Sequence, residues 1–590
     1  MLMLGLVPAN GQDLMQVSDI SGGSSVFVFR KAKSRFVATT RPTRTKTQRT
    51  DSARSVAKQY DSQAHRQRTT FVAPDKVPAS AASMPKDQAS KLFAGVGEYY
   101  LNAKDLDHAN QFFREAISLD GKNAKANEGL SDTLVAKANV ELIDGKTANS
   151  NSAAKAYFDE ALKFNPKNAA AYSGLGAIYS DMEKPDDAIA SFEKALVSDP
   201  GLTAVYQPLG ILYFQKGEIA KADDLLTKSL TTASETAETQ VFLGMIRYSQ
   251  NRNDEALGAF QRAKTLDPTN ADAFYQSGVT LARVGKTSDA IADFQQAVTL
   301  RPAYFDAYRG LGAANIELGK YPDAIAAYKQ AAKLKNDSAA VYIGLGDANR
   351  LAHNFNDAES NYNLAVIFMP RSTDYTQDDI ADVYSKIGFS IGQQCAINMK
   401  QSVPCKWPSA IKALEKAVQA GGNNTADYAN LGWAYYSAAN VDFIQKNPDE
   451  GKLKLEQARI NLQKAVDANP TYVAGPLVNL GMTLTDLGDY NGASANLSRA
   501  VAMHPEWTFA QNELGIAYRK LNNYKDAIKA FQKAIDNDDS FASAQYNLGE
   551  AEFQAGSIGD AKKAYRKLLS MGRKDLAAQL AIISNGAVTK

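Results

Sequence analysis

Small and large apolar residues recur along the chain at one fixed interval. Glycines lie 34 residues apart through the central region, and an alanine follows each glycine twelve residues later. The glycines are Gly176, Gly210, Gly244, Gly278, Gly312 and Gly346, and the alanines are Ala188, Ala222, Ala256, Ala290, Ala324 and Ala358. A large apolar side chain stands four residues after each alanine, as Phe192 does after Ala188. A fixed period of this length is typical of a repeat protein.

The spacing within one period predicts two antiparallel helices. The residues at i, i+3, i+4 and i+7 that form one helical face in the first helix are Tyr172, Leu175, Gly176 and Tyr179. The second helix repeats this pattern, and its exit is marked by a proline such as Pro200, which lacks the N–H that a helix needs. One helix pair cannot cover both of its apolar faces, so the pairs are expected to stack into a solenoid.

Two segments carry a specific family pattern of Leu-Gly, Tyr, Ala, aromatic, Ala and Pro at fixed offsets. They are AYSGLGAIYSDMEKPDDAIASFEKALVSDP (171–200) and ELGIAYRKLNNYKDAIKAFQKAI (513–535). The chain thereby resembles tetratricopeptide repeat (TPR) proteins over about residues 90–574, in thirteen units. Their glycine positions are Gly97, Ser131, Gly176, Gly210, Gly244, Gly278, Gly312, Gly346, Gly388, Gly432, Gly481, Gly515 and Gly549. The resemblance implies an all-α, right-handed superhelical solenoid.

The regular period is interrupted in three units. The second, ninth and tenth units contain additional residues between glycine and alanine, which we expect to form longer turns, and a bend or break is predicted near 371–410. The predicted organisation is an N-terminal arm (1–85), repeats one to eight (86–370), repeats nine to thirteen (371–574) and a C-terminal segment (575–590). Residues 575–583 in that last segment are expected to form a capping helix.

Charge separates the arm from the repeats. The chain of 590 residues has a net charge of only +2, but residues 30–68 contain twelve Lys and Arg against two Asp. This part is rich in Thr, Ser, Pro and Gln and is predicted to be a largely disordered linker. Its charge also permits nucleic-acid binding. Aromatic residues that would stack on bases are sparse there, so a solvated tether is favoured and nucleic acid is not the expected partner.

The beginning of the arm contains two apolar segments. MLMLGLVPANGQ (1–12) is either an ordinary N-terminus or the remnant of an export signal that begins upstream. SGGSSVFVFR (21–30) is rich in strand-forming residues, and it is either a strand that adds to the sheet edge of a partner or a short strand without a specific role. The expected location is exported, periplasmic or secreted, with a cytoplasmic location as the alternative.

The residues that could support chemistry are few. Cys395 and Cys405 lie in the inserted region of the ninth unit, where they form either a disulfide or two free thiols. Four scattered histidines indicate no metal site, and no cofactor motif is present. No apolar run is long enough to cross a bilayer. We therefore expect no enzyme activity, no metal, no cofactor and no transmembrane segment.

The resemblance implies that the first helices of the repeats line a concave groove. Large side chains next to the Leu-Gly pair are candidate contacts for a partner, unless neighbouring helices bury them against one another. The candidates are Ile211, Phe214, Phe242, Met245, Tyr248, Tyr275, Trp433 and Tyr436. Asn430, Asn479 and Asn547 precede the pair and resemble the asparagine ladder of O-linked N-acetylglucosamine transferases, unless they are merely solvated amides.

The function that these features predict is a scaffold or adaptor that binds extended peptide segments of other proteins in the groove. Two alternatives remain open at the level of sequence. One is an envelope-associated assembly factor anchored through the N-terminal arm, and the other is nucleic-acid binding through residues 30–68. The sequence alone leaves the oligomeric state open.

Overall fold

The structure is a computed structural model of the whole chain. It describes residues 6–9, 12–18, 24–28 and 84–589, apart from the gaps 145–149, 233–234, 401–404, 422–423, 445 and 469–473. The chain divides into two compact units, one formed by residues 38–310 and the other by residues 1–37 together with 311–590. The division lies inside α15 (Phe305–Glu317), so the break predicted near residue 371 is not the boundary between the units.

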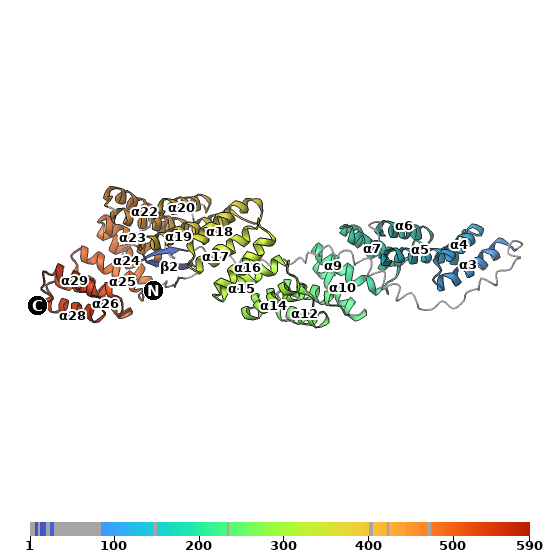
Figure 1. Cartoon of the computed structure of the whole chain (residues 1–590), viewed down its shortest axis with the longest axis horizontal. Coiled ribbons are helices and arrows are strands. Elements are labelled where there is room, and N and C mark those ends of the chain that lie inside the picture. The colour runs from blue at the N-terminus through green and yellow to red at the C-terminus, as the bar shows by residue number, and fades with distance from the viewer. Residues whose placement is uncertain are drawn as a thin grey trace. The chain divides into compact units, whose positions relative to one another are not determined.

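Twelve helices of the described residues form six successive antiparallel pairs in the unit 38–310 (Figure 1). They are α3 (Lys86–Asn102), α4 (Leu106–Leu119), α5 (Ala124–Asp144), α6 (Ser150–Phe164), α7 (Ala169–Asp181), α8 (Pro185–Ser198), α9 (Tyr206–Lys216), α10 (Ile219–Thr232), α11 (Ala237–Ser249), α12 (Asn253–Leu266), α13 (Ala271–Arg283) and α14 (Thr287–Leu300). A short 3₁₀ turn, Thr203–Val205, precedes α9.

The other unit continues the same arrangement from residue 311 on. Its helices are α16 (Tyr321–Leu334), α17 (Ala339–Leu351), α18 (Phe355–Phe368), α19 (Gln377–Lys400), α20 (Trp407–Gly421), α21 (Thr425–Ile444), α22 (Pro448–Ala468), α23 (Ala474–Leu487), α24 (Tyr490–Met503), α25 (Thr508–Lys520), α26 (Tyr524–Asn537), α27 (Ala542–Gln554), α28 (Ile558–Ser570) and α29 (Lys574–Ile583). The described residues contain twenty-six helices from α3 to α28, the number that thirteen two-helix units require. A helical solenoid is thus confirmed for the described residues from 84 on.

The glycines and aromatic residues of the period pack against one another inside each pair. A Cβ atom on Gly176 of α7 would lie 2.7 Å from the ring of Phe192 on α8, closer than side chains approach. Phe192 and Ala188 are fully buried. The backbone of α7 therefore reaches the ring directly, which explains why glycine stands at this position. Asn168 begins α7 because its side chain accepts a 3.1 Å hydrogen bond from the N–H of Ala171.

The inserted residues of the irregular units mostly lengthen helices instead of turns. The first helices of these units, α5, α19 and α21, have 21, 24 and 20 residues, while regular first helices such as α7 have 13. The second helix α22 has 21 residues. The prediction of long turns is therefore wrong for most of the additional residues, since a longer helix satisfies its backbone hydrogen bonds internally whereas a loop does not.

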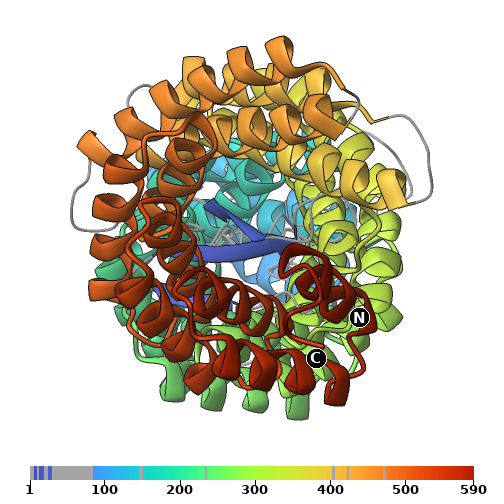
Figure 2. The same ribbon diagram turned by 90° about the vertical axis from the view of Figure 1, so that its left-hand side faces the viewer.

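The N-terminal region contributes a small sheet that the period does not predict. Strands β1 (Leu6–Ala9), β2 (Gln12–Ser18) and β3 (Ser24–Val28) pair antiparallel in the order β1-β2-β3, with Met15 opposite Phe27. β3 contacts α21 and α23, and Figure 2 shows the strands on the inner side of the helices of this unit. The sequence indicated a strand only around residues 21–30.

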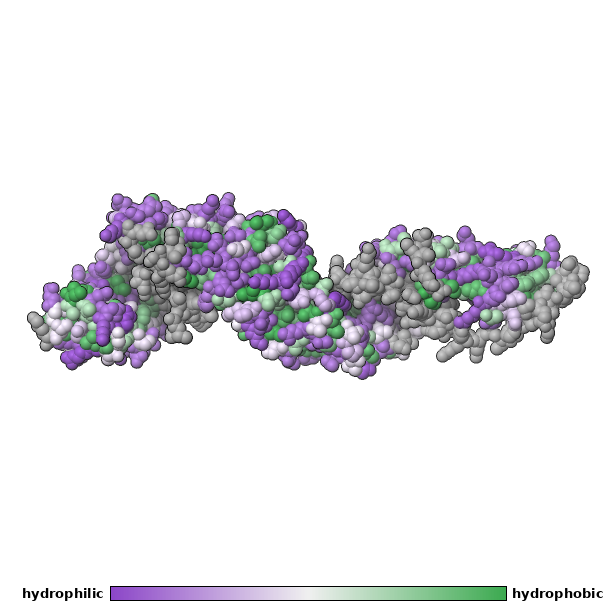
Figure 3. Space-filling view, in the orientation of Figure 1, coloured by the Kyte–Doolittle hydropathy of each residue, from purple (hydrophilic) through white to green (hydrophobic). Residues whose placement is uncertain are grey.

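The last helix of the described residues is α29. α29 contacts α27 and α28 at the residues where a capping helix is predicted. The face drawn in Figure 3 is mostly hydrophilic, with apolar residues in small groups. None of the helices in the described part of the chain combines the length and the apolar character needed to cross a membrane.

Candidate protein-binding surface

The aromatic candidates in the unit 38–310 pack against one another. The rings of Phe214 on α9 and Phe242 on α11 meet edge to face at 5.6 Å, and both are buried in one core together with Met245 and Ile211. Tyr275 is buried beside Tyr304, and Tyr248 is half-buried under the Arg283 guanidinium. These side chains are therefore buried or half-buried among neighbouring helices, which is one of the two alternatives that the sequence left open, and a role in binding a partner stays a prediction.

Trp433 is also a packing residue. It lies on α21 between Phe389, at 6.4 Å, and Trp407, at 5.4 Å, and it is 2% exposed. A Cβ atom on Gly392 of α19 would lie 2.5 Å from the Trp433 ring, so this glycine gives the indole its space. Tyr436 is buried on the same helix. Both side chains are therefore buried, the alternative to partner contact that the sequence left open.

The three asparagines differ in their surroundings. The side-chain N–H of Asn547 on α27 donates a 2.9 Å hydrogen bond to Oδ1 of Asn512 on α25, so this amide joins two neighbouring repeats. Asn430 on α21 and Asn479 on α23 are 0% and 1% exposed, and both have interaction partners. They are thus not solvated amides. They lie on the two helices that β3 contacts.

A charged residue extends this row by one repeat. Lys386 stands two residues before Gly388 on α19, just as Asn430 and Asn479 stand two residues before Gly432 and Gly481. Lys386, Asn430 and Asn479 therefore occupy equivalent positions on three successive first helices, and we call them the donor row. The sequence search for asparagines missed the lysine, although the position relative to the glycine identifies it.

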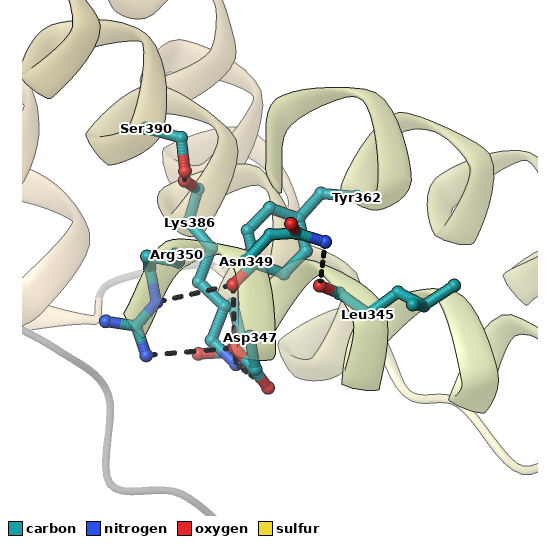
Figure 4. A network of polar contacts seen from close by, with 8 residues as sticks. Leu345, Asp347, Asn349, Arg350, Tyr362, Lys386 and Ser390 are labelled. Atoms are coloured by element: carbon teal, nitrogen blue, oxygen red, sulfur yellow. Dashed lines mark hydrogen bonds and ion pairs between the residues drawn. The ribbon is translucent and has the colours of Figure 1, made fainter. Parts of the chain in front are cut away.

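Lys386 belongs to a network of polar side chains (Figure 4). Its ammonium lies 2.9 Å from Oδ1 of Asp347 on α17 and 3.4 Å from Asp382. The hydroxyl of Tyr362 on α18 donates a 2.7 Å hydrogen bond to Asp347, and the side chain of Arg350 donates at 3.3 Å to that hydroxyl. Two carboxylates and two cations thus balance one another next to the asparagines.

Burial and neighbouring charges shift the pKa values of the side chains in this network. Burial alone would raise the pKa of Asp347, but the charges of Lys386 and Arg350 lower the pKa below its ordinary value. Burial disfavours the charged form of Lys386, and the two aspartates nevertheless raise its pKa. Burial and the Asp347 carboxylate raise the pKa of Tyr362 far above its ordinary value. The network therefore holds its charges at neutral pH and can offer charge-assisted hydrogen bonds.

The helices of the asparagines are largely buried, α23 more completely than α21. Every residue of α23 from Ala474 to Leu484 is buried. On α21, the fully buried Asp427 accepts a 3.1 Å hydrogen bond from the hydroxyl of Ser385. First helices in the same unit can be more open, since α15 leaves Leu311 and Ala313 half-buried. The side of α21 and α23 that β3 contacts is called the α21/α23 surface below.

The two cysteines lie near the C-terminal end of α19 and just before α20. The structure joins Cys395 of α19 and Cys405, just before α20, in a disulfide with Cα atoms 4.8 Å apart. The N–H of Lys406 donates a 2.9 Å hydrogen bond to the Cys395 sulfur, which is buried. The bond fixes the end of the longest helix against the start of its partner.

The remaining candidate chemistry is limited. Within the described ranges, no group of three or more His, Cys, Asp or Glu side chains is placed to hold a metal ion. The structure does not describe the basic residues 30–68, on which the nucleic-acid alternative rests. The part of the N-terminal arm beyond β3, on which the anchoring alternative rests, also lies outside the described residues.

The paired helices and the enclosed inner surface define a helical-repeat solenoid, a class that generally serves as a scaffold for protein–protein interaction. Family models agree with this class. Models described as tetratricopeptide repeat match residues 91–123, 157–190, 275–339, 316–371 and 512–579, and one described as TPR repeat matches residues 244–285. The chain therefore contains tetratricopeptide repeats in these segments. The matched models describe repeats and not a catalytic domain.

Solved structures resemble parts or most of the chain. YrrB, described as a TPR protein with an unusual peptide-binding site, is 24% identical over 31% of this chain and 95% of its own, with a TM-score of 0.28. MamA is 26% identical over 28% of this chain and 95% of its own, with a TM-score of 0.26. The Cut9–Hcn1 hetero-tetramer structure is 14% identical over 86% and 99%, with a TM-score of 0.35. No curated protein matches the chain significantly.

Proposed function

We propose that this scaffold binds extended segments of partner proteins on the α21/α23 surface, next to the charged network of Lys386. The observation that carries the proposal is the position of strand β3 against α21 and α23. A surface that accommodates one extended backbone has the width and depth to accept another. The proposed binding site is therefore limited to α21 and α23, the first helices of repeats ten and eleven, and does not extend along the whole groove.

The residues on this surface suit a backbone ligand. An amide side chain both donates and accepts hydrogen bonds, so it can satisfy a peptide group without reading its side chain. Lys386 at the end of the donor row adds a cation for a carbonyl or carboxylate oxygen. The buried apolar residues around them, such as Val478 and Met482 of α23, exclude water and strengthen these bonds. Affinity would come mainly from the backbone, with modest selectivity for apolar side chains.

A displayed library of ten-residue peptides tests the proposal on the full-length chain. We expect enrichment of apolar, extended sequences, and at least tenfold weaker binding of the enriched peptides by the Asn430→Ala/Asn479→Ala variant. Leu453→Ser, a change at a 58% exposed position of α22, is the matched control and should bind as the unmodified chain does. An absence of enrichment, or equal affinity of the asparagine variant and the control, would refute the proposal.

A further inference from the structure

We infer that strand β3 is a built-in ligand of the donor row, held through hydrogen bonds from Asn430 and Asn479 to its free backbone edge. A partner segment then has to displace β3, so the preferred partner is itself an extended, apolar, strand-forming segment. The inference rests on the proposed function in one respect: it concerns the same surface. It adds the identity of the occupant and the competition between the occupant and a partner.

The sheet leaves one edge of β3 available. In the order β1-β2-β3, β3 pairs with β2 on one side only, through registers such as Gln16 with Val26 and Leu14 with Val28. Among the described strands, none pairs with the side of β3 that points away from β2. Backbone groups in an enclosed place need hydrogen-bond partners, because an unsatisfied buried group destabilises the fold. The helices α21 and α23 lie against this strand and carry suitable side chains.

The two asparagines also need partners. Asn430 and Asn479 are more deeply buried than Asn547, and neither amide is without a partner. Asn547 satisfies its own amide with Asn512 across adjacent first helices. No such asparagine pairing joins Asn430 with Asn479 among the hydrogen bonds of the described side chains. Strand β3 contacts both of their helices, so its backbone is a partner within reach of the two amides.

Spacing and composition fit the same arrangement. Packed helices lie about 8–10 Å apart, which is the length of about three residues of a strand. The five residues of β3 therefore span the distance from α21 to α23. Three of these five residues, Val26, Phe27 and Val28, are of types that favour strands. The segment that the sequence marked as a candidate for pairing with a partner is thus the segment placed at the surface of its own chain.

Limited trypsin digestion of the full-length protein tests this inference. Residues 1–29 contain no Lys or Arg, whereas residues 30–68 contain twelve, so trypsin releases Met1 to Arg30 with all three strands intact. After digestion, gel filtration separates free fragment from fragment that stays with the helices, and mass spectrometry measures both. We expect most of the fragment to elute with the helices. Elution of the fragment by itself would overturn the inference.

Variants assign the interaction to particular residues. Asn430→Ala/Asn479→Ala should reduce retention at least fivefold, while Asn547→Ala, which removes a buried amide of the same row position, should leave it unchanged. Val26→Pro removes a backbone N–H from the strand without altering any helix, and it should also release the fragment. Equal retention in all variants would overturn the role of the asparagines. Release of the fragment together with asparagine-dependent binding of library peptides would refute this inference alone and leave the proposed function intact.

Discussion

Lys386 on α19 places its ammonium 2.9 Å from Oδ1 of Asp347 on α17, across two consecutive repeats. Both side chains are less than a quarter exposed, at 13% and 23%. The lysine stands at the row position that asparagine fills in the next two repeats. The pair therefore ties together the helices on one side of the α21/α23 surface, and its loss should be felt as stability as well as binding.

Removing one partner of this pair leaves the other charge buried and unpaired. Asp347→Asn should lower the free energy of unfolding by about 3 kcal/mol, because an uncompensated buried charge is costly. Lys386→Met in the Asp347→Asn background should recover part of the loss, which a double-mutant cycle by urea denaturation measures. Additive losses in the double variant would contradict a direct interaction between these side chains.

The same pair limits the pH range of stability. The pKa of Asp347 is lowered and that of Lys386 is raised, so their contribution is complete between the ordinary pKa values of the two groups. It is lost as the pH falls through the lowered pKa of Asp347, or rises through the raised pKa of Lys386. Between pH 5 and 9 we expect this pair to contribute no pH dependence.

Glu552 on α27 is expected to give such a dependence near neutrality. Burial and the Asp560 carboxylate raise its pKa to about 7, although Lys563 partly opposes the shift. A raised pKa in the folded state means that stability is greatest below the ordinary value near 4.5 and declines as the pH rises through 7. Because solvent partly screens the group, the decline from pH 5 to pH 8 should be about 1–2 kcal/mol.

Glu552→Gln removes this titration. The variant should be more stable than the unmodified chain at pH 8 and should show a flatter pH profile in chemical denaturation. Glu456→Gln, at an exposed position of α22, is the control and should keep the original slope. An unchanged slope in Glu552→Gln would show that another group causes the dependence.

Two glycines of one repeat should respond in opposite ways to alanine. A Cβ atom on Gly244 of α11 would lie 2.5 Å from the Phe260 ring. A Cβ atom on Gly258 of α12 would have no neighbouring atom within 4 Å. Gly244→Ala should therefore cost about 1–3 kcal/mol through overpacking. Gly258→Ala should stabilise by about 0.5–1 kcal/mol, because alanine favours the helix. Thermal denaturation compares them, and equal effects would contradict the close approach at Gly244.

The link between Cys395 and Cys405 predicts sensitivity to reduction. Closing a loop of this size stabilises by about 2–3 kcal/mol, so a reductant should lower the unfolding free energy of the unmodified chain by that amount. Cys395→Ala/Cys405→Ala should already have lost it and should not respond further. Mass spectrometry with thiol labelling checks the bond directly, and two free thiols in the oxidised protein would contradict it.

The sequence was sufficient to predict the helical repeats, but it was insufficient to predict how side chains pack on their inner surface. Gly176 and Phe192 are diagnostic because their packing is local to one helix pair and follows the period. The sequence leaves the burial of Trp433 and Phe242 open, because it depends on neighbouring repeats, here on Phe389 and Phe214. The sheet β1-β2-β3 obeys no repeat, and its position against α21 and α23 is a contact between distant parts of the sequence that periodicity does not encode.

The central claim is that α21 and α23 hold an extended backbone, and cross-linking from the strand measures it most directly. Replacing Phe27 in the full-length chain with the photoreactive p-benzoylphenylalanine keeps an aromatic ring within β3. After irradiation, we predict intramolecular cross-links to peptides from residues 425–444 and 474–487. Cross-links exclusively to other helices, or exclusively between two chains, would contradict the account.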